Sequence, residues 1–217
     1  MTESLNSSQE GVGSDASELA MFPLGSTVFP GQVMPLHIFE ERYRTMLKKL
    51  TEPEAHGTFG IVLIDRGHEV GGGDTRVKVA TRVNILEAEE LDDGRWGVVT
   101  AGVERLNIVE WLPDDPFPRA MVTARAVKDD GGSSLDDLES LLRETMDAAA
   151  RRAGVQPPGE IQYSSDPQQR LDQMSALSPL IDFDRQHVLE ASTTSVQMER
   201  LTEALEGKLT VLRAVIE

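Results

Sequence analysis

The sequence contains no cysteine, which excludes disulfide bonds, cysteine-ligated zinc, iron–sulfur clusters and thiol nucleophiles. Basic residues are scarce, because 21 Lys and Arg stand against 37 Asp and Glu and give a formal net charge of −16. A negative field of this size repels phosphate backbones and anionic lipid headgroups, so we expect neither nucleic acid nor a membrane as partner. No apolar run approaches the roughly 20 residues that a membrane-spanning helix needs. Together with an acidic N-terminal stretch that does not resemble a secretion signal, these absences predict a cytoplasmic protein.

Motifs for enzymatic chemistry are missing as well. The one Gly-Lys pair, Gly207-Lys208, lacks the upstream glycine of a phosphate-binding loop, and no serine lies in a G-x-S-x-G elbow. None of the four histidines has the spacing of a helical zinc site, and His37, between two apolar residues, is better explained as a structural histidine. We therefore expect no catalytic residue, no metal site and no cofactor, and the chain is not expected to be an enzyme.

The first part of the chain is predicted to be β-rich, over residues 20–127. Residues 1–19 have few apolar side chains and predict a disordered tail. From Ala20 onward, three prolines and two glycines separate short apolar runs, which favours edge strands and tight turns. Between Glu40 and Leu50, apolar residues at spacings of three and four predict a short helix.

Strand patterns then follow in series. Thr58–Ile64 is a continuous apolar run, and residues 77–85 alternate between apolar and polar side chains. Asp92-Asp93-Gly94 supplies the residues of a hairpin turn. Gly102 separates two further strand-like runs, and another follows Pro118, so at least five or six strands are expected.

The second part, residues 128–217, is predicted to be helical. A polar, glycine-bearing segment after Val127 has the composition of a linker, and four amphipathic stretches follow it. The predicted helices begin after the cap of Ser134, at Asp166-Pro167, at Asp184 and at Thr194. Short polar joints between them predict a small bundle.

Two features are candidates for binding. Gly71, Gly72 and Gly73 with Asp74 could expose backbone N–H groups to an anion or an extended peptide, although a plain strand connection explains them equally simply. Apolar side chains near turns are the other candidates, and a role in the core is their alternative explanation. They include Phe29, Met34, Trp96, Trp111 and Phe117.

Several of these blocks resemble one known family. Residues 22–47 are similar to the opening of the Lon protease N-terminal, substrate-binding domain, with similar blocks at 59–64, 69–74, 93–95 and 102–105 and in the C-terminal helical part. Two departures are Ala80 where the family usually has Gly, and Leu106 where Phe is usual. The blocks extend over almost the whole chain.

The resemblance implies an α+β fold, with a PUA-like β-barrel followed by a C-terminal helical bundle. It implies a stand-alone member without ATPase or protease modules, which recognises exposed apolar segments of unfolded polypeptides. We expect its groove near Phe29, Met34, Tyr43 and the loop of Gly71, Gly72, Gly73 and Asp74. The alternative is a structural or adaptor protein that self-associates or docks on a full-length Lon protease. RNA binding, known for other PUA-like domains, conflicts with the net charge of −16.

Overall fold

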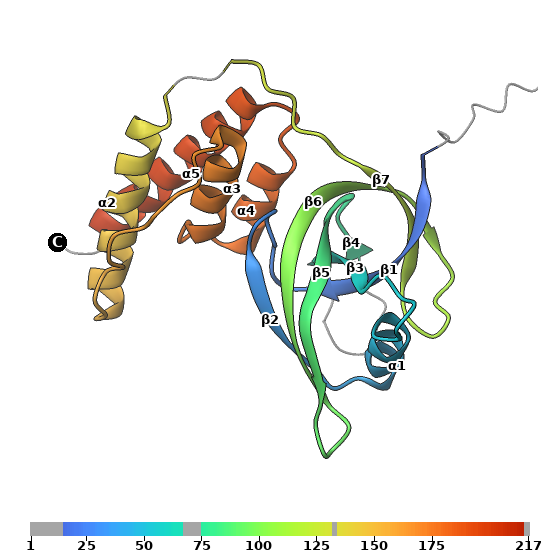
Figure 1. Ribbon diagram of the computed structural model, residues 1–217. Helices are drawn as coiled ribbons and strands as arrows, with labels where there is room; N and C mark the ends of the chain where they lie inside the picture. Colours follow the sequence, from blue (N-terminus) through green and yellow to red (C-terminus); the bar gives the residue numbers. More distant parts are fainter. Residues whose placement is uncertain (1–14, 67–74, 132–133, 215–217) are drawn as a thin grey trace, which may run out of the picture.

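The computed structural model describes residues 15–66, 75–131 and 134–214 (Figure 1). Strands dominate the first part of the chain, with one helix, α1 (Glu41–Leu50), among them. The strands are β1 (Ser17–Leu24), β2 (Val33–Ile38), β3 (Thr58–Arg66), β4 (Thr75–Arg76), β5 (Val79–Glu90), β6 (Trp96–Leu112) and β7 (Arg119–Ala124). The later helices are α2 (Asp136–Ala153), α3 (Pro167–Leu177), α4 (Asp182–Leu189) and α5 (Thr194–Ala214).

The strands form one mixed sheet whose pairings close on themselves. They run β1–β7–β6–β5–β3, and β3 returns to β1 through a parallel pairing, whereas the other pairs are antiparallel. β1 is therefore paired on both edges and is not an edge strand, contrary to the sequence prediction. It also starts at Ser17, inside the predicted tail, because Ser17–Ala20 are in register with Val122–Arg119 of β7. Residues 1–14 of that tail lie outside the described residues.

The prediction that Gly102 separates two strands is wrong, because β6 continues through it for 17 residues. Gly102 is needed for a close crossing instead: a Cβ built there would lie 2.1 Å from the backbone oxygen of Phe29. The crossing is fixed by two hydrogen bonds, from the Gly102 N–H to the Gln32 oxygen and from the Gly31 N–H to the Gly102 oxygen, both 2.9 Å. Gly102 thus holds the β1–β2 connection against the sheet.

Local signals in the sequence located most turns and helix starts correctly. The hairpin at Asp92-Asp93-Gly94 is confirmed, with Gly94 at φ +77° and the Leu91 N–H bonded to the Arg95 oxygen. Asp166 caps α3 as predicted, accepting a 2.8 Å bond from the Gln169 N–H. The α+β class is confirmed. The finer assignments, a PUA-like barrel and a helical bundle in separate domains, stay predictions.

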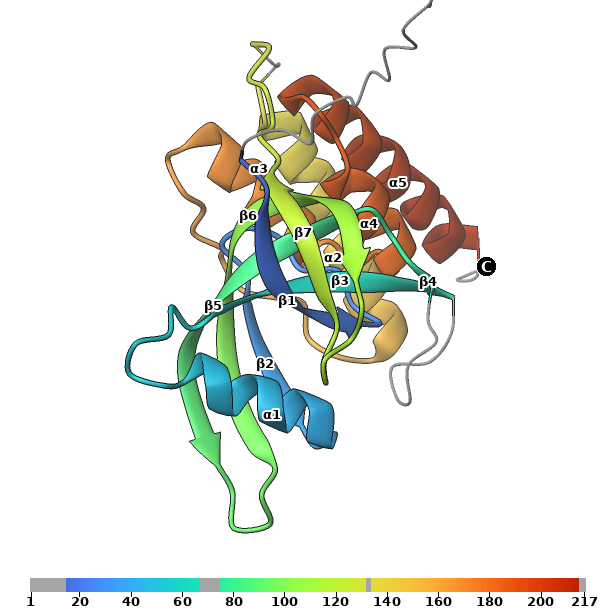
Figure 2. The same cartoon turned by 90° about the vertical axis from the view of Figure 1, so that its right-hand side faces the viewer.

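Three larger hydrophobic clusters hold the described part of the fold together, and a small fourth one joins α2 to α5. One contains side chains from all five strands of the closed ring, where Ala80 and Ala120 leave room for larger neighbours such as Leu106. A second lies between the sheet and α1, which packs across the lower part of the sheet in Figure 2. The third is shared by α2, α3, α4 and α5. Among the described helices, none combines the length and apolarity needed to cross a bilayer.

Candidate functional site

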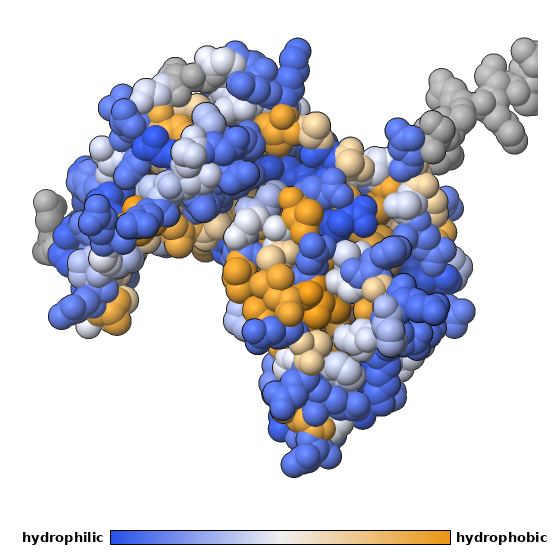
Figure 3. Space-filling view, viewed as in Figure 1, coloured by the Kyte–Doolittle hydropathy of each residue, from blue (hydrophilic) through white to orange (hydrophobic). Residues whose placement is uncertain are grey.

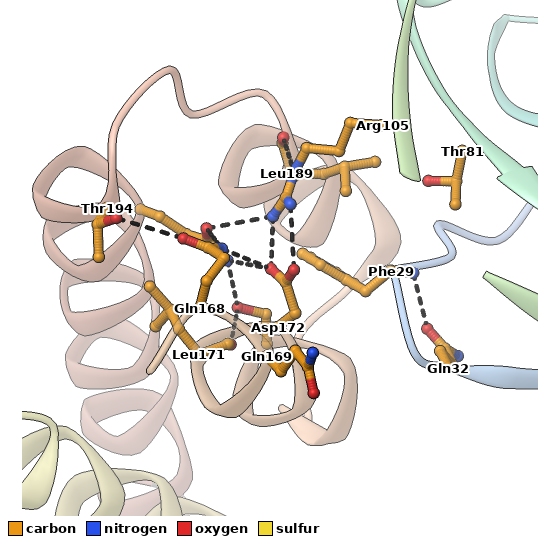
Figure 4. Close-up of polar contacts among 12 residues, drawn as sticks. Phe29, Gln32, Thr81, Arg105, Gln168, Gln169, Leu171, Asp172, Leu189 and Thr194 are labelled. Atoms are coloured by element: carbon orange, nitrogen blue, oxygen red, sulfur yellow. Dashed lines mark hydrogen bonds and ion pairs between the residues drawn. The ribbon is translucent and has the colours of Figure 1, made fainter. Parts of the chain in front are cut away.

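A buried polar network joins the sheet to the helices (Figure 4). Arg105 of β6 is only 4% exposed, and its guanidinium donates to both carboxylate oxygens of Asp172 on α3, at 3.1 and 2.5 Å. It also donates to the backbone oxygen of Leu189 and to the Gln197 side chain, each at 3.1 Å. Gln197 and Gln168 donate in turn to Asp172, at 2.8 and 3.2 Å. The Asp172 carboxylate is therefore held by several hydrogen bonds of defined direction. Together with the bond to the Leu189 oxygen, they fix α3, α4 and α5 against β6.

The β1–β2 connection forms a second link. Phe29 leaves the sheet and is completely buried among the side chains of α2–α5, while the Thr81 hydroxyl donates a 2.6 Å bond to the preceding backbone oxygen. Two residues earlier, the Thr27 N–H donates to the Asp182 carboxylate at 2.8 Å. Gln186 of α4 donates to the Val79 oxygen at 3.0 Å. These contacts place the start of β2 close to the helices.

A hollow lies directly beside this junction. It has a volume of about 360 Å³, and its walls come from the start of β2, the α2–α3 connection and the C-terminal half of α3. Figure 3 shows the molecule from the open side of this region, with hydrophobic surface on both the sheet and the helix side. The lining residues are Gly31, Gln32, Val33, Ile161, Gln162, Tyr163, Gln173, Ala176 and Leu177.

The lining is uncharged and largely apolar. Val33 and Leu177 are 57% and 42% exposed, so both are available to a ligand. Burial raises the pKa of the Tyr163 hydroxyl, which therefore stays neutral over an even wider pH range than usual. Gln32 and Gln173 supply amides, of which Gln32 already accepts from Arg185 and from the Phe29 N–H. An apolar hollow with a few amides at its wall is suited to binding side chains and main-chain groups of another chain.

Arg185 does not line the hollow but contacts Gln32, which does. Its guanidinium lies 3.1 Å from the Gln32 amide oxygen, 3.5 Å from the Asp182 carboxylate and 5.8 Å from the Phe29 ring centre. Burial lowers the pKa of Arg185, and the nearby Asp182 charge partly offsets that change. Because it is held on three sides, Arg185 supports the position of Gln32. Among the described residues, no group of three His, Cys, Asp or Glu side chains could hold a metal ion.

The predicted site residues are not brought together. Phe29 is 0% and Tyr43 2% exposed, and the two side chains belong to two different hydrophobic clusters. Both are therefore core residues in this structure, and a contact of either with a bound peptide stays a prediction. Met34 is half-buried and lines a neighbouring depression of about 240 Å³ with Leu24, Leu36 and Phe39. The loop Gly71–Asp74 lies outside the described residues.

The residues that do line the hollow were missed. Ile161 and Tyr163 are two bulky side chains within a connection that, apart from Val155, is otherwise made of Pro, Gly and polar residues, and that contrast was the available signal. Leu177 is the last residue of α3 and is 42% exposed, so the apolar spacing of the helix does not distinguish it from the buried Leu171 and Met174. Asp172, a single carboxylate between Leu171 and Met174, was the corresponding signal for the buried network.

Comparison with known proteins gives a consistent family. The model of the ATP-dependent protease La (LON) substrate-binding domain matches residues 18–207. The Lon protease of Phenylobacterium zucineum is 24% identical over 203 residues, covering 92% of this chain and 26% of that protein. The Lon protease of Solibacter usitatus is 28% identical over 225 residues, with 93% and 26% covered. The chain thus spans about a quarter of the length of these curated relatives.

Two solved structures share the fold. A Lon N-terminal domain protein from Xanthomonas campestris has a TM-score of 0.64 at 20% identity, over 86% of this chain and 98% of that one. The N-terminal domain of Mycobacterium avium complex Lon protease has a TM-score of 0.53 at 17% identity, over 89% and 98%. At these identities the likeness supports the fold alone.

Proposed function

Because the chain belongs to the ATP-dependent protease La (LON) substrate-binding domain family, we propose that it is a non-enzymatic module that binds exposed apolar segments of unfolded polypeptides. The observation that supports this most directly is the apolar, uncharged hollow between β2 and α3, with Val33 and Leu177 exposed in its walls. Its volume of about 360 Å³ lies within the range of protein sites that bury a ligand. The cytoplasmic location and the independence from ATP are part of the same proposal.

The size of the hollow sets the strength of binding. Burying two side chains of leucine size contributes about 3–6 kcal/mol, from which the entropic costs of association are lost. Since 6 kcal/mol before these costs corresponds to a dissociation constant of only about 40 μM, two such side chains alone give dissociation constants of about 0.1 mM or weaker, as suits a module that must release varied segments. Met34, in the neighbouring depression, is proposed to extend the apolar surface, and the loop Gly71–Asp74 is proposed to meet peptide carbonyls with its N–H groups.

Binding of a fluorescent apolar peptide should be saturable without nucleotide, whereas a polar peptide of the same length should not bind. Val33→Asp and Leu177→Asp should each weaken apolar-peptide binding by about tenfold, because one apolar wall is lost and a carboxylate must be desolvated. Fluorescence anisotropy measures both effects.

Val211→Asp is the matched control. Val211 is 61% exposed on α5, does not line the hollow and receives the same change in side chain and charge. Its affinity for the peptide should equal that of the wild type. If all three variants bind like wild type, or if the apolar peptide does not bind, the proposed site is wrong.

Self-association, or docking on a full-length Lon protease, is the alternative function. A leucine-striped helix could favour self-association, but the leucines of α5 pack inside the chain, because Leu201, Leu205, Leu209 and Leu212 are 5% exposed or less. Of these, Leu201 and Leu205 belong to the helix core, which lowers the apolar area left for a second copy. Light scattering separates the two readings, and the peptide-binding proposal predicts no dimer at micromolar concentration.

A further inference from the structure

The outer face of β2, β6 and β5 continues the hollow towards a pair of carboxylates. Val33, Pro35 and His37 alternate along β2, so their side chains lie on one face of the sheet. Pro35 is in register with Val99 of β6, and Val99 is in register with Glu87 of β5. His37 is aligned in the same way with Gly97 and Glu89. Directly opposed residues share a face, so this face changes from apolar at Val33 to acidic at Glu87 and Glu89.

This face is hollowed as well. Pro35, Val99, Glu87 and Glu89 line a depression of about 480 Å³. Val33, two residues before Pro35 on the same face of β2, lines the first hollow, so lining residues of the two depressions lie about 7 Å apart along this strand. A chain seated in the first hollow can therefore continue over the second without leaving the surface.

The two carboxylates are not neutralised locally. Glu87 and Glu89 are exposed, and within the part of the chain that the structure describes neither has an ion-pair partner. Two cations in this part of the fold pair with other carboxylates, because Lys48 forms an ion pair with Glu90 and Arg95 forms one with Asp93. With a formal net charge of −16, the whole molecule also attracts a cationic segment over longer distances.

Pro35 disfavours one mode of binding, the addition of the segment as a further strand at the edge of β2. Among the described strands β2 pairs with β6 alone, so its other edge is open. Pro35 lacks an N–H group and interrupts the row of donors that an added strand would need. The edge is therefore poorly suited to strand addition, and the exposed face is the better contact surface.

We propose that this face selects extended segments in which apolar side chains are followed, about three to five residues away, by lysine or arginine. The proposal rests on the proposed function and names the class of segment that the site prefers. From Val33 to Glu87 is about 12 Å, from two residues along a strand and two strand spacings of about 4.8 Å. An extended chain spans that distance in about four residues. The apolar part then fills the hollow while the cation meets Glu87 and Glu89.

The test uses three labelled peptides of equal length with one apolar half. The peptides differ only at two positions, three to five residues from the apolar part. Both positions are Lys in the first peptide, Gln in the second and Glu in the third. In low salt, the Lys peptide should bind about three- to tenfold more tightly than the Gln peptide, as expected for two exposed ion pairs, and the Glu peptide more weakly than both. The double variant Glu87→Gln/Glu89→Gln should lose most of this preference and keep only the small part that comes from the remaining net charge. High salt should have the same effect.

Glu203→Gln/Glu206→Gln is the matched control, since it removes the same charge from exposed positions on α5. It should keep the preference for the Lys peptide, which separates a local contact from the general field. Equal affinity of wild type for the Lys and Gln peptides overturns this inference and leaves the proposed function standing, as does a preference that survives undiminished in Glu87→Gln/Glu89→Gln. If no apolar peptide binds, the proposed function fails and the inference with it.

Discussion

Replacing Arg105 with alanine is expected to lower the free energy of unfolding by about 3–5 kcal/mol, because it leaves a buried carboxylate without its cation. Asp172 is 3% exposed and would keep only the amide donors of Gln168 and Gln197. The Leu189 oxygen would also lose its donor. Urea unfolding followed by circular dichroism measures the change. Arg105→Lys should recover part of it, since an ammonium keeps the charge but not the paired geometry.

Arg82→Ala provides the comparison. Arg82 lies on the adjacent strand and pairs with Glu104 at 2.8 Å, but the two side chains are 23% and 40% exposed. A pair of this kind contributes about 0–1 kcal/mol. Asp172→Ala should cost about as much as Arg105→Ala, and the double variant much less than the sum of the two, because they remove one interaction. Losses for Arg105→Ala as small as for Arg82→Ala would contradict the assigned role of the network.

Phe29→Ala is expected to destabilise the protein by about 3–5 kcal/mol, the cost of removing a fully buried aromatic side chain. The ring is 0% exposed and fills a space between four helices from a loop of the sheet half, so the cavity would open at the junction itself. The fixed backbone crossing at Gly102 limits how far the loop can move to refill it. Thermal and urea unfolding both measure the loss.

Phe183→Ala is the control for this change. Phe183 is the same residue type on nearby α4 but is 53% exposed, so its replacement should change stability by about 0.5 kcal/mol or less. The comparison also separates two roles, since a Phe29 side chain that contacted ligand directly would be removable at little cost to folding. A stability change for Phe29→Ala no larger than for Phe183→Ala would restore the groove role predicted from sequence.

Local chemistry explains which elements could be predicted. Asp166-Pro167 begins a helix and Asp93-Gly94 forms a turn because the capping bond and the positive φ are satisfied within a few residues. The role of Gly102 was predicted wrongly because it depends on a residue far away in the sequence. The backbone of Phe29, 73 residues earlier in the chain, lies against Gly102 in the fold, and no local sequence pattern indicates that contact. A glycine in a strand indicates either a break or a close approach, and only the fold decides between them.

The hollow could not be predicted for the same reason. Its walls come from residues 31–33, 161–163 and 173–177, which are far apart in sequence and meet only after the Arg105 network and Phe29 have fixed the helices to the sheet. The family resemblance predicted a role in binding polypeptides, whereas the aromatic residue near a turn that was singled out most clearly, Phe29, is buried in the structure. Exposed aliphatic residues beside a junction give no periodic signal of their own.

Binding of an apolar polypeptide segment between β2 and α3 can be located by amide chemical shifts on addition of an unlabelled apolar peptide. The largest shifts should occur at the residues that line the hollow, Val33, Ile161, Tyr163 and Leu177 among them, and Val211 on α5 should not shift. Shifts centred elsewhere, or no shifts at a concentration of peptide that saturates the anisotropy signal, would contradict it.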